Sequence, residues 1–118
     1  MNLSKAGNSR RCADHVVHNG VGYFVEVPPD ASADFETQVL ATLKSLDEEM
    51  AAAGTDRTKL LLVHIYLTDI ANIDRFNLHW DTWLDGAKPP VRACVEPAKL
   101  ADPLYAVELV ATVAIPNT

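Results

Sequence analysis

The stretch HVVHNGVGYFVEV, residues 15–27, carries the strongest structural signal in the chain. Two short runs of branched and aromatic residues flank Asn19-Gly20, and Asn-Gly favours the tight turn of a two-residue β-hairpin. Pro28 and Pro29 end the second run, because proline has no backbone N–H to donate to a sheet. The stretch therefore predicts two antiparallel strands at the start of the fold.

The rest of the chain alternates between helical and extended patterns. In two segments apolar residues recur every three or four positions, and a glycine follows each segment where helices commonly end. Other runs are rich in branched and aromatic residues, which favour strands. After the hairpin we expect a helix from Ser32 or Asp34 to Ala53, a strand over 59–68, a helix from Asp69 to Gly86, and strands over 91–96 and 105–115.

This order, β-β-α-β-α-β-β, predicts a two-layer α+β sandwich with a mixed sheet and both helices on one of its faces. A chain of 118 residues suffices for one hydrophobic core, so residues 1–118 are expected to form a single domain. Residues 1–11 are largely polar and are expected to be a flexible N-terminal segment.

The face of the sheet away from the helices is expected to be apolar as well. The strand over 59–68 has mixed residues at its even positions, and Val110 and Thr112 lie on the corresponding side of the last strand. Such a surface is too apolar for open water, so we expect self-association through it. The odd positions of the strand over 59–68, which we expect to face the helices, are all apolar: Leu61, Val63, Ile65 and Leu67.

Composition excludes several classes of function. The formal net charge is −6 at pH 7 and the basic residues are scattered, which opposes nucleic acid as a partner. The longest apolar run, residues 60–67, is too short to span a membrane, and the N-terminal stretch lacks the apolar core of a signal peptide. Cys12 and Cys94 make no disulfide framework or zinc motif, so we expect a cytoplasmic protein. His15 and His18 on one strand would face opposite sides, and we expect no metal.

One arginine stands out because it lies in a short strand beside a cysteine. In the strand over 91–96, Arg92, Cys94 and Glu96 alternate with Val91, Ala93 and Val95. If these three apolar residues face the helices, Arg92 and Glu108 lie together on the other face. The pair then has two interpretations. Arg92 can hold a substrate carboxylate while Glu108 positions or deprotonates water, or the two form a structural ion pair at an interface. We interpret Cys94 first as a small buried side chain.

Two stretches resemble one protein family. The segment PPVRACVEPAKLADPLYAVELVATVAI, residues 89–115, looks like the C-terminal signature of the RidA/YjgF reactive-intermediate deaminases. The segment EEMAAAGTDRTKLLLVHIYLTDIANIDRFNLHW, residues 48–80, resembles the central stretch of that family, including the glycine after the first helix and an asparagine in the second. The likeness extends over about residues 15–115 and implies a fold like that of chorismate mutase.

The resemblance implies a homotrimer with clefts between its subunits. It also implies hydrolysis of enamine or imine acids, such as 2-iminopropanoate and 2-iminobutanoate, to 2-keto acids and ammonia, without any cofactor. By position, Arg92 matches the arginine that grips the substrate carboxylate, and Glu108 matches the glutamate that holds the attacking water. Cys94 matches a cysteine that lines the pocket, and Asn77 matches an asparagine near the cleft.

The chain departs from the family pattern at its second strand. Val25, Glu26 and Val27 occupy the place of a Ser-Gly-Gln type segment that lines the pocket, and Cys12 is nearest to the position of a common N-terminal tyrosine. The spacing from Arg92 to Glu108 is one residue longer than in the best-known members. We expect Val25 and Glu26 to contact the substrate, with Glu26 narrowing the pocket or placing a negative charge beside an anionic ligand.

Two other functions compete with the deaminase. The altered segment at Val25–Val27 favours a non-catalytic trimer that binds or senses small carboxylates such as 2-keto acids. Endoribonuclease activity is a label attached to some relatives, and the acidic charge of this chain opposes it.

Overall fold

A β-hairpin opens the ordered core of the sheet, as the sequence predicts. In the computed structural model, which describes residues 3–116, β2 (His15–His18) pairs antiparallel with β3 (Val21–Glu26). Asn19 and Gly20 join the two strands with positive φ angles of 53° and 74°. Both turn positions therefore have the conformation that Asn-Gly accepts most easily.

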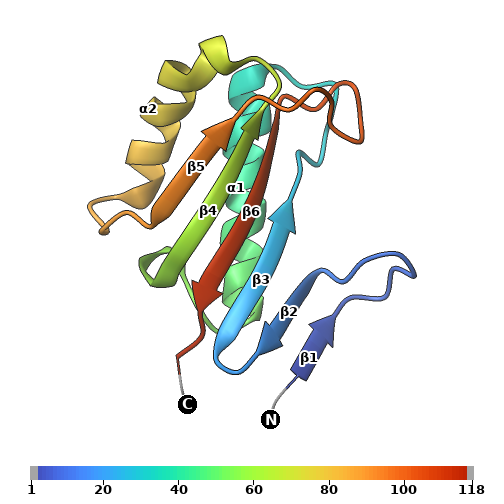
Figure 1. The fold of residues 1–118 in the computed structure, drawn as a ribbon, viewed down its shortest axis with the longest axis vertical. Helices are drawn as coiled ribbons and strands as arrows, with labels where there is room; N and C mark the ends of the chain where they lie inside the picture. Colours follow the sequence, from blue (N-terminus) through green and yellow to red (C-terminus); the bar gives the residue numbers. More distant parts are fainter. Residues whose placement is uncertain (1–2, 117–118) are drawn as a thin grey trace.

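The sheet has six strands in the order β1-β2-β3-β6-β4-β5 (Figure 1). The strand β6 (Val107–Ala114) lies between β3 and β4 (Leu60–Leu67) and is antiparallel to both. At one edge, β5 (Val91–Val95) runs parallel to β4, so the sheet is mixed. The predicted two-layer α+β architecture is confirmed.

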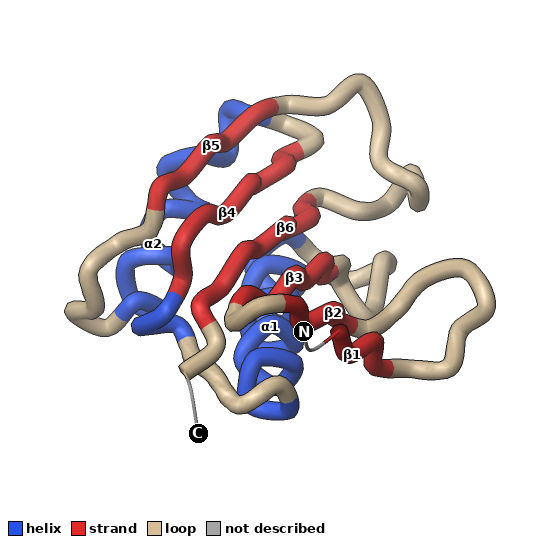
Figure 2. The backbone as a smooth tube through the Cα atoms, turned by 60° about the horizontal axis from the view of Figure 1, so that its bottom comes forward, coloured by secondary structure: helices blue, strands red, loops and turns tan. Residues whose placement is uncertain are grey.

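Both helices cover the same face of the sheet (Figure 2). The first, α1 (Phe35–Ala52), begins after Asp34, whose side chain accepts a 2.8 Å hydrogen bond from the backbone N–H of Thr37. The second, α2 (Ile73–Leu84), lies in the connection between β4 and β5. Short 3₁₀ turns, Arg57–Lys59 and Ile70–Asn72, precede β4 and α2. No helix in the described part of the chain is long and apolar enough to cross a membrane.

The hydrophobic core lies between the helices and the inner face of the sheet. Alternate residues of β6 are buried, while those between them are only half-buried. Each aliphatic side chain that folding removes from water stabilises the fold by about 1.5–3 kcal/mol. The buried side chains come from β6 (Val107, Leu109, Ala111, Val113), β4 (Val63, Ile65, Leu67), α1 (Val39, Leu43, Leu46, Met50) and α2 (Phe76, Trp80).

The prediction of a flexible segment over residues 1–11 is wrong for part of its length. Residues 3–6 form β1 (Leu3–Ala6), which pairs antiparallel with β2, while residues 1 and 2 lie outside the described part of the chain. The side chains of β1 are mostly exposed, so its hydrophobic pattern gives no strand signal. Backbone hydrogen bonds hold it instead, including one of 2.8 Å from the N–H of Asp14 to the carbonyl of Ala6.

One inward position of β4 also differs from the expectation. Leu61 is 46% exposed, whereas Leu60 is 8% exposed and belongs to the core. The pairing of β4 with β6 shifts between Leu60 and Leu62, as it does at a β-bulge. The bulge reverses the alternation at the start of the strand, and Val63, Ile65 and Leu67 face inward as predicted.

A buried glutamine ties two loops to the start of α1. Gln38 is 3% exposed. Its Nε2 lies 3.0–3.1 Å from the carbonyl oxygens of Ala31, Ala33 and Leu104, and its Oε1 accepts a 2.7 Å hydrogen bond from the N–H of Ala106. The loop that follows β3 and the loop that precedes β6 are therefore held by one side chain.

We expect Gln38→Leu to lower the free energy of unfolding by about 1–3 kcal/mol, because it leaves the partly buried N–H of Ala106 without its partner. Urea unfolding measures the change. Lys44→Leu, at an exposed position of the same helix, is the matched control and should change stability little. Equal stability of Gln38→Leu and the wild type would contradict this role of the glutamine.

Candidate functional site

Arg92 lies on the helix-facing side of the edge strand β5. It is the register partner of Val63, which is fully buried beneath the helices. Its Nη1 donates a 2.8 Å hydrogen bond to Oδ1 of Asn77 on α2, and its guanidinium carbon is 5.6 Å from the centroid of the Trp80 ring. These two contacts fix the orientation of the guanidinium. The structure thus brings together Arg92 and Asn77, which the sequence singled out separately.

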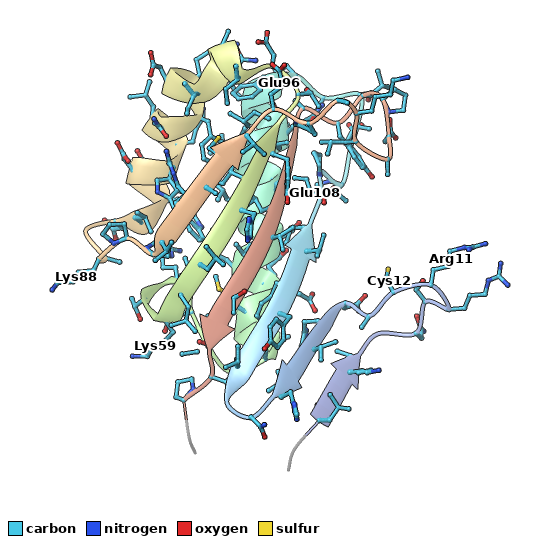
Figure 3. All side chains as sticks on the ribbon, in the orientation of Figure 1. Arg11, Cys12, Lys59, Lys88, Glu96 and Glu108 are labelled. Carbon is cyan, nitrogen blue, oxygen red and sulfur yellow. The ribbon has the colours of Figure 1, made fainter. Side chains whose placement is uncertain are left out.

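Glu108 lies on the opposite face, which corrects the expectation that it shares a face with Arg92. It is the register partner of Tyr66, and its neighbours in sequence, Val107 and Leu109, both point into the core. Figure 3, which looks onto the helix-free face, labels Glu108 towards the upper end of β6. Within a single chain, the sheet itself therefore separates the arginine from the glutamate.

The expectation fails because the apolar residues of β5 do not face the helices. Val91 and Val95 are 71% and 48% exposed and lie on the helix-free face, beside Leu62 and Tyr66 of β4. Arg92 takes an inward position because α2 offers its guanidinium an amide oxygen and an indole ring. The Trp80 side chain is part of the hydrophobic core and also contacts the Arg92 guanidinium. It lies three residues after Asn77, so both side chains occupy the same face of α2.

The Arg92 guanidinium borders a cleft of about 490 Å³. Asn77 and Trp80 of α2 and the loop residues Ala87 and Pro90 are among the residues that line it. Among residues 3–116, no carboxylate lies within ion-pair distance of Arg92. The guanidinium has five N–H donors, so one hydrogen bond to Asn77 leaves most of them available for an anion.

Cys94 also faces the helices and packs against the core, next to Ile65. Burial raises the pKa of its thiol, and the nearby charge of Arg92 offsets this only in part. A neutral, partly buried thiol is a weak nucleophile. The geometry therefore agrees with the interpretation of Cys94 as a small packed side chain near Arg92.

The helix-free face is apolar, as the sequence predicts. Tyr23 and Val25 on β3 are 48% and 57% exposed, and half-buried Val110 and Thr112 lie beside them on β6. Glu108 is half-buried at the end of this row, and burial raises the pKa of its carboxyl. A carboxyl with a raised pKa exchanges protons more readily near neutral pH than an exposed one does.

A second cleft, of about 510 Å³, lies over this face. Strands β2, β3 and β6 form its floor, and the loop between β1 and β2 forms one wall. Val25 and Cys12 both line it, so two positions at which the chain departs from the family pattern lie in one cleft. Figure 3 labels Cys12 in that loop.

Glu26 is not among the residues that line either cleft. It alternates with Val25, so it lies on the helix-facing side of β3, next to the buried Leu109. Its Oε2 is buried and has no hydrogen-bond partner among the described residues. Burial, together with the charges of Glu49 and Asp14, raises the pKa of Glu26 to about 7. Glu26 therefore narrows neither cleft of the single chain, and its contact with a ligand at a subunit boundary stays a prediction.

The surroundings of Glu26 add negative charge without a compensating cation. Glu49 on α1 lies 2.7 Å from Nδ1 of His15, measured from its Oε1. Among the described residues, no basic side chain forms an ion pair with Glu26 in the way that His15 pairs with Glu49. The described residues also hold no group of three or more histidine, cysteine or acidic side chains that could bind a metal ion.

The raised pKa predicts how stability depends on pH. Because the pKa is about 7 in the folded protein against an ordinary value of 4.5, the folded state binds more protons than the unfolded state between these values. Stability should therefore fall as the pH rises from about 4.5 through 7. We expect Glu26→Gln, which cannot ionise, to be about 1–2 kcal/mol more stable than the wild type at pH 8, allowing for solvent screening.

At pH 5 the same variant should differ little from the wild type, since Glu26 is then protonated in the folded protein. Urea unfolding at both pH values measures the difference. Glu48→Gln, which removes an exposed carboxylate from α1, is the matched control. An equal gain for Glu26→Gln at both pH values would contradict the assignment.

Comparisons with known proteins identify the family. The family model described as endoribonuclease L-PSP matches residues 24–115. A RutC family protein from Haemophilus ducreyi is 35% identical, covering 96% of this chain and 97% of the relative. The RutC family protein YoaB from Escherichia coli is 31% identical, covering 92% and 95%.

Solved structures agree with these relatives. A member of the YjgF protein family from Neisseria meningitidis superposes with a TM-score of 0.89 at 30% identity, covering 100% of this chain and 98% of that one. An uncharacterized protein from Pseudomonas aeruginosa gives 0.90 at 28% identity, covering 98% and 100%. The matching family model, the similar relatives and the fold all lead to the same conclusion: the chain belongs to the RutC/YjgF/Rid family.

Proposed function

We propose that this protein hydrolyses reactive 2-imino and enamine acids to 2-keto acids and ammonia, at clefts between the subunits of a homotrimer. The observation that carries the proposal is the state of Arg92. Its guanidinium is oriented by Asn77 and Trp80, borders a cleft and has no carboxylate partner within residues 3–116. An oriented, unpaired guanidinium is suited to holding the carboxylate of a small substrate through two parallel hydrogen bonds.

For this reaction the protein needs only to orient the imine and to transfer protons. Water adds to the electrophilic imine carbon and gives a carbinolamine, from which ammonia leaves as the 2-keto group forms. Glu108 takes a proton from the attacking water and returns one to the departing nitrogen. Its half-buried carboxyl, with a raised pKa, is suited to both transfers. The positive charge of Arg92 holds the substrate carboxylate and so fixes the position of the imine carbon.

The opposite orientations of Arg92 and Glu108 favour a site shared between subunits. A small ligand cannot contact both side chains within one chain, because the sheet lies between them. Arg92 is on β5, which is an edge strand, so a neighbouring copy of the chain can approach its guanidinium. The exposed apolar residues near that edge of the helix-free face, Val91 and Val95, also favour burial against another copy. A cyclic trimer repeats one such contact three times.

A non-catalytic trimer that binds small carboxylates is the second candidate. It is favoured by the valine at position 25, which lies beside Val110 and near Glu108 on the helix-free face and restricts the polar surroundings that a catalytic water needs. The matching family model is described as an endoribonuclease. The net charge of −6 opposes that activity here, because RNA is itself negatively charged.

The first test is the hydrolysis of 2-iminopropanoate, generated in solution by an amino-acid oxidase. We expect the wild type to accelerate it and Arg92→Ala to lose about 10²-fold in kcat/KM, because the carboxylate loses its charged partner. Arg92→Lys keeps the charge without the planar fork and should fall between the two. Wild-type rates in Arg92→Ala would contradict the mechanism, and binding of 2-keto acids without turnover would favour the second candidate.

A mixing experiment tests whether the site is shared. Arg92→Ala and Glu108→Gln are each expected to be inactive, and the two proteins are unfolded and refolded together in equal amounts. Over all the trimers that refold, about one quarter of the clefts should combine an intact arginine from one chain with an intact glutamate from the next, restoring activity. If each chain held its own complete site, mixing would restore nothing.

A further inference from the structure

The cleft on the helix-free face lies beside Glu108, the residue to which we assign the proton transfers. It begins near Glu108, because Val110 lines it and lies two residues further along the same side of β6. Its opposite wall carries Cys12, in the loop between β1 and β2, and β3 lies between the two walls (Figure 3). A ligand whose reacting carbon lies at Glu108 can therefore extend a substituent towards Cys12.

The cleft is lined almost entirely by apolar groups. Val16, Tyr23, Val25 and Val110 contribute side chains from three neighbouring strands, and none of the described lining residues is lysine or arginine. Its titratable lining residues include Asp14, which would repel a carboxylate, and His15, whose Nδ1 is already paired with Glu49, whereas the cleft at Arg92 offers a guanidinium. The two clefts therefore differ in kind. One suits the charged end of a molecule and the other suits an apolar end.

The size of the cleft exceeds what a three-carbon substrate fills. Its volume of about 510 Å³ falls within the range of ~300–1,000 Å³ that is typical of pockets for much larger ligands. The side chain of Val25 is 57% exposed within it, so a ligand that covers this residue gains apolar contact.

We propose that this cleft receives the side chain of the substrate, and that the protein prefers 2-imino acids with branched aliphatic or aromatic side chains to 2-iminopropanoate. This inference rests on the proposed function, in which Arg92 of a neighbouring subunit holds the carboxylate and Glu108 lies at the imine carbon. Val25 and Val110 are the specificity-determining residues, since they are register partners on the floor of the cleft next to Glu108.

The expected preference follows from apolar burial. Each methylene group that the cleft removes from water strengthens binding about fourfold. A leucine-derived imino acid has three more carbons than the alanine-derived one, so its kcat/KM should be more than about tenfold higher.

Kinetics provide the first test. We expect the wild type to favour the imino acids derived from leucine and phenylalanine over that from alanine, and Val25→Ser to reduce this ratio towards one. Leu78→Ser is the matched control, because Leu78 is 70% exposed on α2, away from this face, and it should leave the ratio unchanged. Hydrolysis of the alanine-derived imine with no preference for larger ones would overturn the inference and leave the proposed function standing.

Protection of Cys12 provides a second test that does not depend on turnover. Cys12 is exposed and lines the cleft, so 2-oxo-4-methylpentanoate should slow its alkylation by iodoacetamide several-fold, whereas pyruvate should not. The rate of alkylation without added acid is the reference, and mass spectrometry quantifies the Cys12 adduct.

The two tests separate the two proposals. Protection of Cys12 by the branched acid, without hydrolysis of any imine, would support the cleft as a side-chain site and overturn the catalytic proposal. Equal protection by both acids, or none by either, would overturn the cleft assignment, because the cleft would then be filled by a neighbouring subunit or left outside the site.

Discussion

The fold depends on one constraint: β6 must insert between β3 and β4. It is antiparallel to both, so it joins the hairpin half of the sheet to the half built around α2. Its inner residues supply the centre of the core, and its outer residues, Glu108 and Val110 among them, form the middle of the helix-free face. The position of the glutamate is therefore fixed by a strand that is paired along both of its sides, whereas Arg92 is carried by an edge strand.

Local patterns were sufficient to predict most of the architecture. The Asn19-Gly20 turn, both helices and the apolar helix-free face follow from the spacing of apolar residues and from turn chemistry. The strand β1 could not be predicted in this way, because exposed side chains carry no periodic signal and its backbone pairing alone holds it. The side chain of Leu60 points inward because of a bulge. A bulge is a property of two paired strands, so the sequence of one strand does not predict it.

The sequence singled out candidate residues, but the orientation of their side chains could not be predicted from it. Arg92, Asn77 and Glu108 were singled out from residue types and from the family resemblance, and the first two are in contact. The direction of Arg92 depends on which face of a five-residue strand is apolar, and alternation alone gives both answers equal support. The apolar character of the neighbouring strand decides it, because Val91 and Val95 continue the same exposed surface. Glu26 differs for the same reason, since its direction follows from the buried Phe24 two residues earlier.

Gln38 has a consequence for motion as well as for stability. Its amide bonds both to the loop after β3 and to the loop before β6. The backbone N–H of Ala106 is therefore protected from hydrogen exchange for as long as its bond to Gln38 is formed. This bond lies one residue before β6 and two before Glu108. A helix residue on the far side of the sheet thus sets the local mobility of the backbone that carries the glutamate.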